Sequence, residues 1–362
     1  MAILAGLLLA ATALAVDIQL TVTRKTPLRG ELEDRVTFGL LKEMTCDSRG
    51  NIFSPSNRKY GSAINAIVRF PQDAGSLTVF SIDSDDGLDG GTITDFDLEP
   101  SGGLFVLARQ VLQYSDVTVP IEFGRTLLIH YDQSGTIRSR LELKLDTNDF
   151  TPTGVAMLPG DEALVVGRHS NDHKTFVISE VFLRNGNLKT RFAFKPEGTK
   201  SSKTGTIASP RVVEPTAIRA NGLIYVLRGT TTEPVYVLSE TGQLLKTVQL
   251  KPTDLEFDSP KITGNELIVS EHQPHVGVKL KQSQGPSLSV FSLETGEIVD
   301  RYFWQHVGGA GLACATSHSL TFIGQDISRR EANDWAIFET VPAGTRTMTP
   351  FAASPKIHTA TQ

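Results

Sequence analysis

The chain of 362 residues contains only two cysteines, four methionines and two tryptophans. Two cysteines allow one disulfide at most, and the CxxC and HExxH spacings of common zinc sites are absent. Neither a G-x-S-x-G nucleophile elbow nor a phosphate-binding P-loop occurs. No apolar stretch after the first 20 residues is long enough to cross a bilayer as a helix. The formal net charge of −5 excludes a generally basic nucleic-acid-binding protein.

Residues that favour β structure are abundant. The chain has 31 glycines, 18 prolines and many short runs of valine, threonine and isoleucine. No long segment has hydrophobic residues at helical spacing. Because 40% of the residues are hydrophobic and 21% are charged, the chain can bury a large core and is not disordered.

The first 15 residues, MAILAGLLLAATALA, form a short apolar run that ends in the small-x-small pattern Ala13-Leu14-Ala15. This pattern predicts a signal peptide over residues 1–15, and hence a secreted or periplasmic protein. An apolar N-terminal strand or helix and an uncleaved anchor remain as alternatives.

A repeated unit follows. Its first half is a strand, a turn and a second strand, as in 96–106, 154–166, 216–226 and 261–269. Its second half is a hairpin with a glycine turn, which needs a positive φ. Gly75, Gly135, Gly186, Gly242 and Gly296 mark this turn at intervals of 51 to 60 residues.

Four strands per unit and six units predict an all-β fold, a six-bladed β-propeller of four-stranded antiparallel blades. Residues 17–23 alternate between polar and apolar side chains, as a half-buried strand does. We expect this N-terminal strand to complete the last blade and close the ring, which removes an exposed sheet edge. The chain is then one domain over residues 16–349, followed by a loose tail over 350–362.

Cys46 and Cys314 occupy equivalent places in the first and last units. Each lies six residues before the first apolar residue of its second strand, Ile52 or Leu320. Because these blades are neighbours in the ring, the two cysteines are candidates for a disulfide that staples its closure. Two buried free thiols are the alternative.

The segments Pro152–Ala156 and Gly222–Val226 resemble the P-x-G-[IV]-A and G-x-[IL]-Y-V pieces of NHL repeats. The resemblance extends to the six-bladed superfamily that includes gluconolactonase-like and TolB-like propellers. In its lactonase branch the resemblance implies a divalent metal held by Glu, Asn and Asp. Thr153 stands at the place of that Asn, whereas Glu214 resembles the metal-binding Glu without a matching Asn or Asp set.

In such a propeller the second strand of each blade ends on the face where the inner strand begins, here named the arginine-bearing face. The candidate ligand-binding residues that follow these strands are Arg109, Arg168, His169, Arg228, Glu271, His272 and Asp326. Three arginines at equivalent positions predict a basic arc for an anionic small molecule, an acidic glycan or the carboxylates of a protein partner. In the alternative interpretation each arginine pairs with an acid or covers apolar surface.

Two long loops of this face, 109–124 and 272–286, are either binding elements or neutral insertions. The acidic loop with Asp83, Asp85 and Asp89 has the oxygen ligands that calcium prefers, but it does not fit the EF-hand pattern, and a solvated turn is the alternative. The sequence therefore predicts no cofactor, with calcium or another divalent metal as the alternative.

The sequence therefore predicts an exported binding module or scaffold that recognises an anionic ligand or a protein partner, without nucleic acid and without a transmembrane segment in the mature chain. The alternative function is a metal-dependent lactonase-like hydrolase. The acids to examine for it are Glu214, Asp258 and Asp326.

Overall fold

The structure is a computed structural model that describes residues 16–28, 44–56, 64–72, 76–82, 88, 91–113, 122–144, 150–160, 162–169, 176–182, 184–194, 214–253, 256–272, 287–304, 307–326 and 335–343. Every regular element within these ranges is a β-strand. A search of the same ranges for a helix with the length and apolarity to cross a membrane gives none. Several features of the sequence analysis lie outside the described ranges. They are the expected leader over 1–15, the tail over 350–362, Gly75 and the acidic loop with Asp83, Asp85 and Asp89.

Four sheets each contain four consecutive antiparallel strands. They consist of β2 (Thr45–Cys46), β3 (Ile52–Ser56), β4 (Ala66–Phe70) and β5 (Thr78–Ser81); β6 (Thr92–Leu98), β7 (Leu104–Gln113), β8 (Glu122–Tyr131) and β9 (Ile137–Glu142); β10 (Phe150–Met157), β11 (Glu162–His169), β12 (Phe176–Phe182) and β13 (Leu188–Phe194); and β14 (Thr216–Ala220), β15 (Leu223–Leu227), β16 (Val235–Ser239) and β17 (Leu244–Val248).

The fifth sheet has eight strands. In spatial order they are β18 (Glu256–Thr263), β19 (Glu266–His272), β20 (Ser287–Ser292), β21 (Ile298–Phe303), β1 (Val16–Pro27), β24 (Trp335–Pro342), β23 (Leu320–Asp326) and β22 (Val307–Ala315). The prediction of an all-β, propeller-like arrangement is confirmed, but six separate four-stranded sheets are not found.

The length of β1 explains this difference. Its residues 20–27 pair antiparallel with β24, as the sequence predicted for the N-terminal strand. Its first residues, 16–19, pair in parallel with residues 300–303 of β21. Because one 12-residue strand hydrogen-bonds to both neighbours, two groups of four strands become one continuous sheet.

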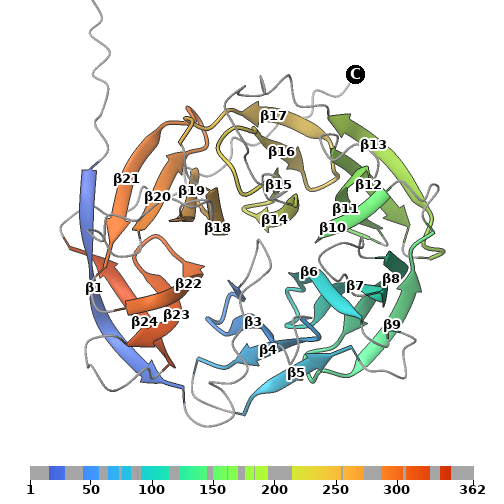
Figure 1. Ribbon diagram of the computed structural model, residues 1–362, viewed down its shortest axis with the longest axis horizontal. Coiled ribbons are helices and arrows are strands. Elements are labelled where there is room, and N and C mark those ends of the chain that lie inside the picture. Colours follow the sequence, from blue (N-terminus) through green and yellow to red (C-terminus); the bar gives the residue numbers. More distant parts are fainter. Residues whose placement is uncertain are drawn as a thin grey trace, which may run out of the picture.

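The sheets are arranged as blades around a central axis (Figure 1), with β6, β10, β14, β18 and β22 nearest the centre and β5, β9, β13, β17 and β21 outside. The turns that close the outer hairpins follow the sequence prediction, since Gly135, Gly186, Gly242 and Gly296 all have positive φ. A Cβ atom on Gly296 would also lie 1.9 Å from a backbone oxygen. Both the positive φ and this close approach therefore disfavour any larger residue at this turn.

Hydrophobic clusters fill the spaces between neighbouring sheets. Phe53 and Phe80 of one sheet pack with Phe96 and Val106 of the next, and all four are fully buried. Because successive side chains of a strand point to opposite faces of its sheet, these apolar strands contribute to the core on both sides of a blade.

Buried polar side chains join the inner strands near the axis. Asp95 of β6 accepts hydrogen bonds from the backbone N–H of Val155 in β10 at 2.9 Å and from the hydroxyl of Thr216 in β14 at 3.1 Å. The hydroxyl of Thr153, in β10, donates to the carbonyl of Pro215 at 2.7 Å. These bonds hold three successive sheets together at the end where β14 begins.

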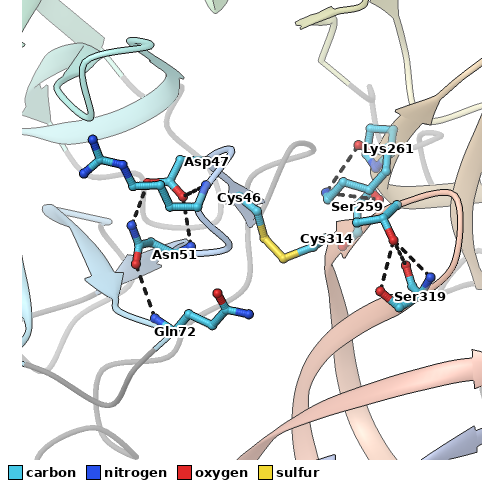
Figure 2. Close-up of a disulfide and its surroundings, with 11 residues drawn as sticks. Cys46, Asp47, Asn51, Gln72, Ser259, Lys261, Cys314 and Ser319 are labelled. Carbon is cyan, nitrogen blue, oxygen red and sulfur yellow. Dashed lines mark hydrogen bonds between the residues drawn. A yellow bond between two sulfur atoms is a disulfide. The ribbon is translucent and has the colours of Figure 1, made fainter. Parts of the chain in front are cut away.

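Cys46 and Cys314 form a disulfide between β2 and β22, with their Cα atoms 5.5 Å apart. The bond joins the first and last parts of the chain (Figure 2). Beside it, the side chain of Asp47 accepts hydrogen bonds from the backbone N–H groups of Arg49 and Asn51, both at 2.9 Å. An aspartate that satisfies its own turn in this way favours the tight β2–β3 connection.

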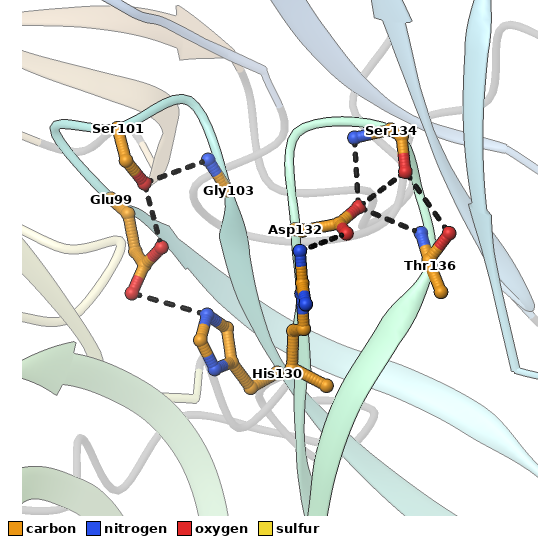
Figure 3. A network of polar contacts seen from close by, with 8 residues as sticks. Glu99, Ser101, Gly103, His130, Asp132, Ser134 and Thr136 are labelled. Atoms are coloured by element: carbon orange, nitrogen blue, oxygen red, sulfur yellow. Dashed lines mark hydrogen bonds and ion pairs between the residues drawn. The ribbon is translucent and has the colours of Figure 1, made fainter.

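The same turn chemistry recurs between β8 and β9 (Figure 3). Asp132 accepts from the backbone N–H groups of Ser134 at 2.9 Å and Thr136 at 3.0 Å. Next to it, Glu99 lies 3.2 Å from the imidazole of His130, whose ring stacks on Phe105. These residues support the hairpins of one sheet, and the polar ones among them are exposed or half-buried, so we assign them a structural role.

Candidate functional site

The three predicted arginines lie at one end of the ring. Arg109 pairs with Thr92, the first residue of β6, and Arg168 pairs with Thr151 near the start of β10. Arg228 directly follows β15, whose last residue is opposite the first residue of β14. The second strands therefore end where the inner strands begin, and the register places the arginines on the arginine-bearing face.

All three arginines interact electrostatically with one acid, Glu214, which lies two residues before β14. Oε1 of Glu214 accepts a hydrogen bond from Arg168 Nη2 in an ion pair of 2.9 Å. Oε2 is buried, and no hydrogen bond reaches it from the part of the chain that the structure describes. Burial raises the pKa of Glu214, while Arg168, Arg228 and Arg109 act in the opposite direction.

Arg109 is the most buried member of this cluster, with 6% of its surface exposed. Burial is the main cause that lowers the pKa of its guanidinium to about 10; Glu214 raises this pKa, and Arg168 lowers it further. Arg109 therefore stays protonated at neutral pH. A buried cation of this kind depends on nearby negative charge, because burial without a counter-charge is costly.

Arg228 has a second acidic partner. Its Nη1 donates to Oε1 of Glu233 at 2.6 Å. Burial raises the pKa of Tyr236 to about 12, and Glu233 adds to this shift while Arg228 opposes it. The phenol of Tyr236 is therefore protonated at neutral pH and is a hydrogen-bond donor rather than a base.

We name Arg109, Arg168, Arg228, Glu214 and Glu233 the arginine cluster. Among the residues that the structure describes, this cluster brings together three guanidiniums and two carboxylates. In this arrangement the arginines converge on Glu214, and each of them also interacts with an acid.

The predicted acids of the same face are engaged elsewhere. Glu271 accepts hydrogen bonds from the hydroxyls of Ser289 in β20 and, at 3.5 Å, Thr253. Asp326 forms an ion pair with Lys25 of β1. Asp258 lies opposite Ser270 in the β18–β19 pair. These contacts fix the strand ends to one another.

The side chains of the remaining predicted ligand-binding residues, His169 and His272, lie outside the part of the chain that the structure describes. The backbones of His169 and His272 end β11 and β19, but their side chains lie outside the described part of the chain, as does most of the loops 109–124 and 272–286.

A metal centre of the lactonase type does not fit the arrangement. Glu214, which resembles the metal-binding Glu of that branch, faces three guanidiniums, and their charge repels a divalent cation. Thr153 donates its hydroxyl to a backbone carbonyl and holds two sheets together. Within the ranges that the structure describes, no group of three or more His, Cys, Asp or Glu side chains is arranged to hold a metal ion.

Sequence reasoning did not single out the Asp97–Arg219 pair. Arg219 Nε of β14 lies 3.4 Å from Asp97 Oδ2 of β6, at the opposite end of these strands. The sequence of β6 shows where its aspartates stand but gives no sign of a partner for Asp97 on a strand so much later in the chain.

No protein-family model matches this chain, and no curated protein matches it. Among solved structures, a Dyadobacter fermentans protein of unknown function superposes with a TM-score of 0.50 at 8% identity, over 90% of this chain and 99% of that one. The GH74 xyloglucanase from Xanthomonas campestris gives 0.45 at 17% identity, over 90% and 46%. Myxococcus xanthus glutaminyl cyclase gives 0.35 at 9%, over 91% and 100%.

The chain spans about half the length of the xyloglucanase chain, 46%, and of the Kuenenia stuttgartiensis hydrazine synthase chain, 56%. At these identities, the similarity to the Dyadobacter protein shows a shared fold and nothing about chemistry.

Proposed function

We propose that the protein is an exported six-bladed β-propeller that binds an anionic ligand through the arginine cluster. The eight-stranded sheet counts as two blades in this proposal, β18–β21 and β22–β24 with β1. Val290 and Tyr302 of the first group pack with Phe322 and Phe338 of the second in one buried cluster. Such face-to-face packing supports two blades, because residues of one flat sheet do not face each other. The Cys46–Cys314 disulfide supports export to an oxidising compartment, the periplasm or the exterior.

The observation that supports anion binding is the convergence of Arg109, Arg168 and Arg228 on Glu214. A guanidinium binds a carboxylate or phosphate through parallel N–H···O bonds. Glu214 occupies the place that the anionic group of a ligand would take, so a ligand carboxylate competes with it for Arg168. The convergence of several guanidiniums favours a ligand with two or more negative charges, because such a ligand pairs with more than one of them.

Protonation of Glu214 favours binding. Because burial raises the pKa of this carboxyl, it takes up a proton at a higher pH than an exposed glutamate does. The protonated form no longer competes for Arg168, and its O–H is then a hydrogen-bond donor to a bound anion. Affinity for an anion whose own charge is constant should therefore rise as the pH falls through this pKa.

The test is calorimetric titration of the mature protein with citrate at neutral pH. We expect saturable binding that weakens about tenfold or more in Arg168→Gln, since one charge-assisted bidentate contact is removed. The matched control is Arg125→Gln, because Arg125 is an exposed arginine that also pairs with a glutamate, Glu142, at 2.7 Å. Equal citrate binding in Arg168→Gln and the unaltered protein would refute the assignment, as would no binding at any pH.

A metal-dependent hydrolase is not proposed as a second function. It would require a cation beside Glu214, where the three arginines already stand. The resemblance to NHL, gluconolactonase-like and TolB-like propellers is retained as a proposal about the fold alone.

A further inference from the structure

A cavity of about 680 Å³ opens at the end of the ring opposite the arginine cluster. Its lining includes Leu98, Ala220 and Ala315, the last residues of the inner strands β6, β14 and β22. The arginine cluster stands where the inner strands begin, so the two sites are at opposite ends of the same strands. A volume of several hundred Å³ is that of cavities that hold a small organic ligand.

Three cations line this cavity: Arg49 in the β2–β3 turn and, on neighbouring inner strands, Arg219 on β14 and Lys261 on β18. Lys261 is buried, with 8% of its surface exposed. Its Nζ donates to the carbonyl oxygens of Ser259 and Pro260, both at 3.3 Å. Figure 2 shows Lys261 and Ser259 on the other side of the Cys46–Cys314 disulfide from Asp47.

The backbone of β18 is irregular where it places Lys261. Ser259 has a φ of 49°, a left-handed conformation that is uncommon for residues other than glycine. The pairing with β19 also shifts between Asp258 and Lys261, as it does at a β-bulge. Bulges redirect the side chains that follow them, and here the side chain that follows is a buried lysine.

The carboxylates of the cavity are already bound. Asp97 accepts from a backbone N–H of β10 at 2.9 Å and pairs with Arg219. Asp47 accepts from two backbone N–H groups of its own turn. Glu339 pairs with Arg24 of β1 at 3.3 Å. Asp97 and Glu339 are each paired with an arginine, so a ligand carboxylate would share Arg219 with Asp97 and would bind Lys261 in addition to its carbonyl partners.

The rest of the lining is largely apolar. Leu77, Leu98, Ile218 and Ile262 are half-buried and present hydrophobic surface to the cavity. Covering such surface with an apolar ligand gains about 25 cal/mol per Å². An inorganic anion leaves this surface in water, whereas the apolar body of an organic acid covers it.

We propose that this cavity binds an amphipathic carboxylic acid, with its carboxylate at Arg219 and Lys261 and its apolar chain against the leucine and isoleucine side chains. The proposal concerns a second site, independent of the arginine cluster. The Cys46–Cys314 disulfide lines the same cavity, and both cysteines are half-buried, so a bound chain shields the disulfide from reagents.

The experiment is calorimetric titration of the intact, oxidised protein with decanoate, decylamine and citrate. We expect decanoate to bind, decylamine to bind at least tenfold more weakly because its charge is opposite, and citrate not to displace decanoate. Lys261→Gln should weaken decanoate binding about tenfold. The matched control is Lys246→Gln, since the Nζ of Lys246 also donates to a backbone carbonyl, at 2.9 Å, but does not line the cavity.

A second measurement on the unaltered protein covers the case in which Lys261→Gln fails to fold. Saturating decanoate should slow reduction of the Cys46–Cys314 disulfide by a phosphine, whereas citrate should leave the rate unchanged. Equal binding of decanoate and decylamine would overturn the role of Arg219 and Lys261. A reduction rate that decanoate does not alter would overturn the location of the site.

Discussion

Removal of the Cys46–Cys314 disulfide is the change whose effect follows most directly from the structure. The two cysteines are 268 residues apart in the sequence, so the bond closes a very long loop of the unfolded chain. Chain-entropy arithmetic for a loop of this length gives a stabilisation of about 5.6 kcal/mol at room temperature, which is an upper value, since measured effects of disulfides are typically about 2–4 kcal/mol. We expect Cys46→Ala/Cys314→Ala to lower the free energy of unfolding by about 2–5 kcal/mol.

The assay is equilibrium unfolding in urea, followed by fluorescence, for the oxidised protein, the reduced protein and the double variant. The reduced protein and the variant should lose similar amounts of stability, and reductant should not alter the variant. A loss below about 1 kcal/mol would refute the reasoning, because it would mean that the pairing of β1 with β24 closes the ring without help from the disulfide. Two reactive thiols in the denatured, unreduced protein would show that the bond is not formed.

Three further predictions concern single residues. Gly296→Ala should destabilise the protein clearly more than Gly160→Ala, because both glycines have positive φ but only at Gly296 would the new Cβ meet a backbone oxygen at 1.9 Å; thermal unfolding of the pair checks this, and equal losses would contradict it. Asp95→Ala should cost about 1–3 kcal/mol in urea unfolding, since it leaves two buried donors without their acceptor, whereas the exposed Asp17→Ala should stay within about 0.5 kcal/mol. Binding of ethane-1,2-disulfonate, which stays doubly ionised, should strengthen as the pH falls through the raised pKa of Glu214, and Glu214→Gln should abolish this dependence; a pH profile that Glu214→Gln leaves intact would assign the titration to another group.

The local elements of the fold were predictable because they depend on short-range rules. Short apolar runs predicted the strands of the repeats, and glycine positions predicted the turns, since only glycine adopts positive φ there without strain. The equivalent positions of Cys46 and Cys314 in the repeats made them candidates for a disulfide, and the structure forms this bond with their Cα atoms 5.5 Å apart. The pattern of Asp17–Thr23 likewise predicted that the N-terminal strand pairs with the last strand.

Long-range partners were not predictable, because a strand's sequence specifies which face is apolar but not what lies across that face. The parallel pairing of residues 16–19 with β21, which merges two groups of four strands, depends on how far β1 extends past β24. The repeat placed Arg109, Arg168 and Arg228 at one end of the ring, but only the tertiary structure showed that all three share Glu214.

The sequence by itself determined the type of each element, the order of the repeats and the end of the ring at which the arginines stand. These follow from short apolar runs and turn chemistry, which act over a few residues, and from the spacing of the repeats. The tertiary structure alone decided the charge balance of the arginine cluster, the bulge that places Lys261 and the cavity beside the disulfide. Each of these joins residues from several blades, and ion pairing and desolvation depend on distances in space that sequence spacing does not specify.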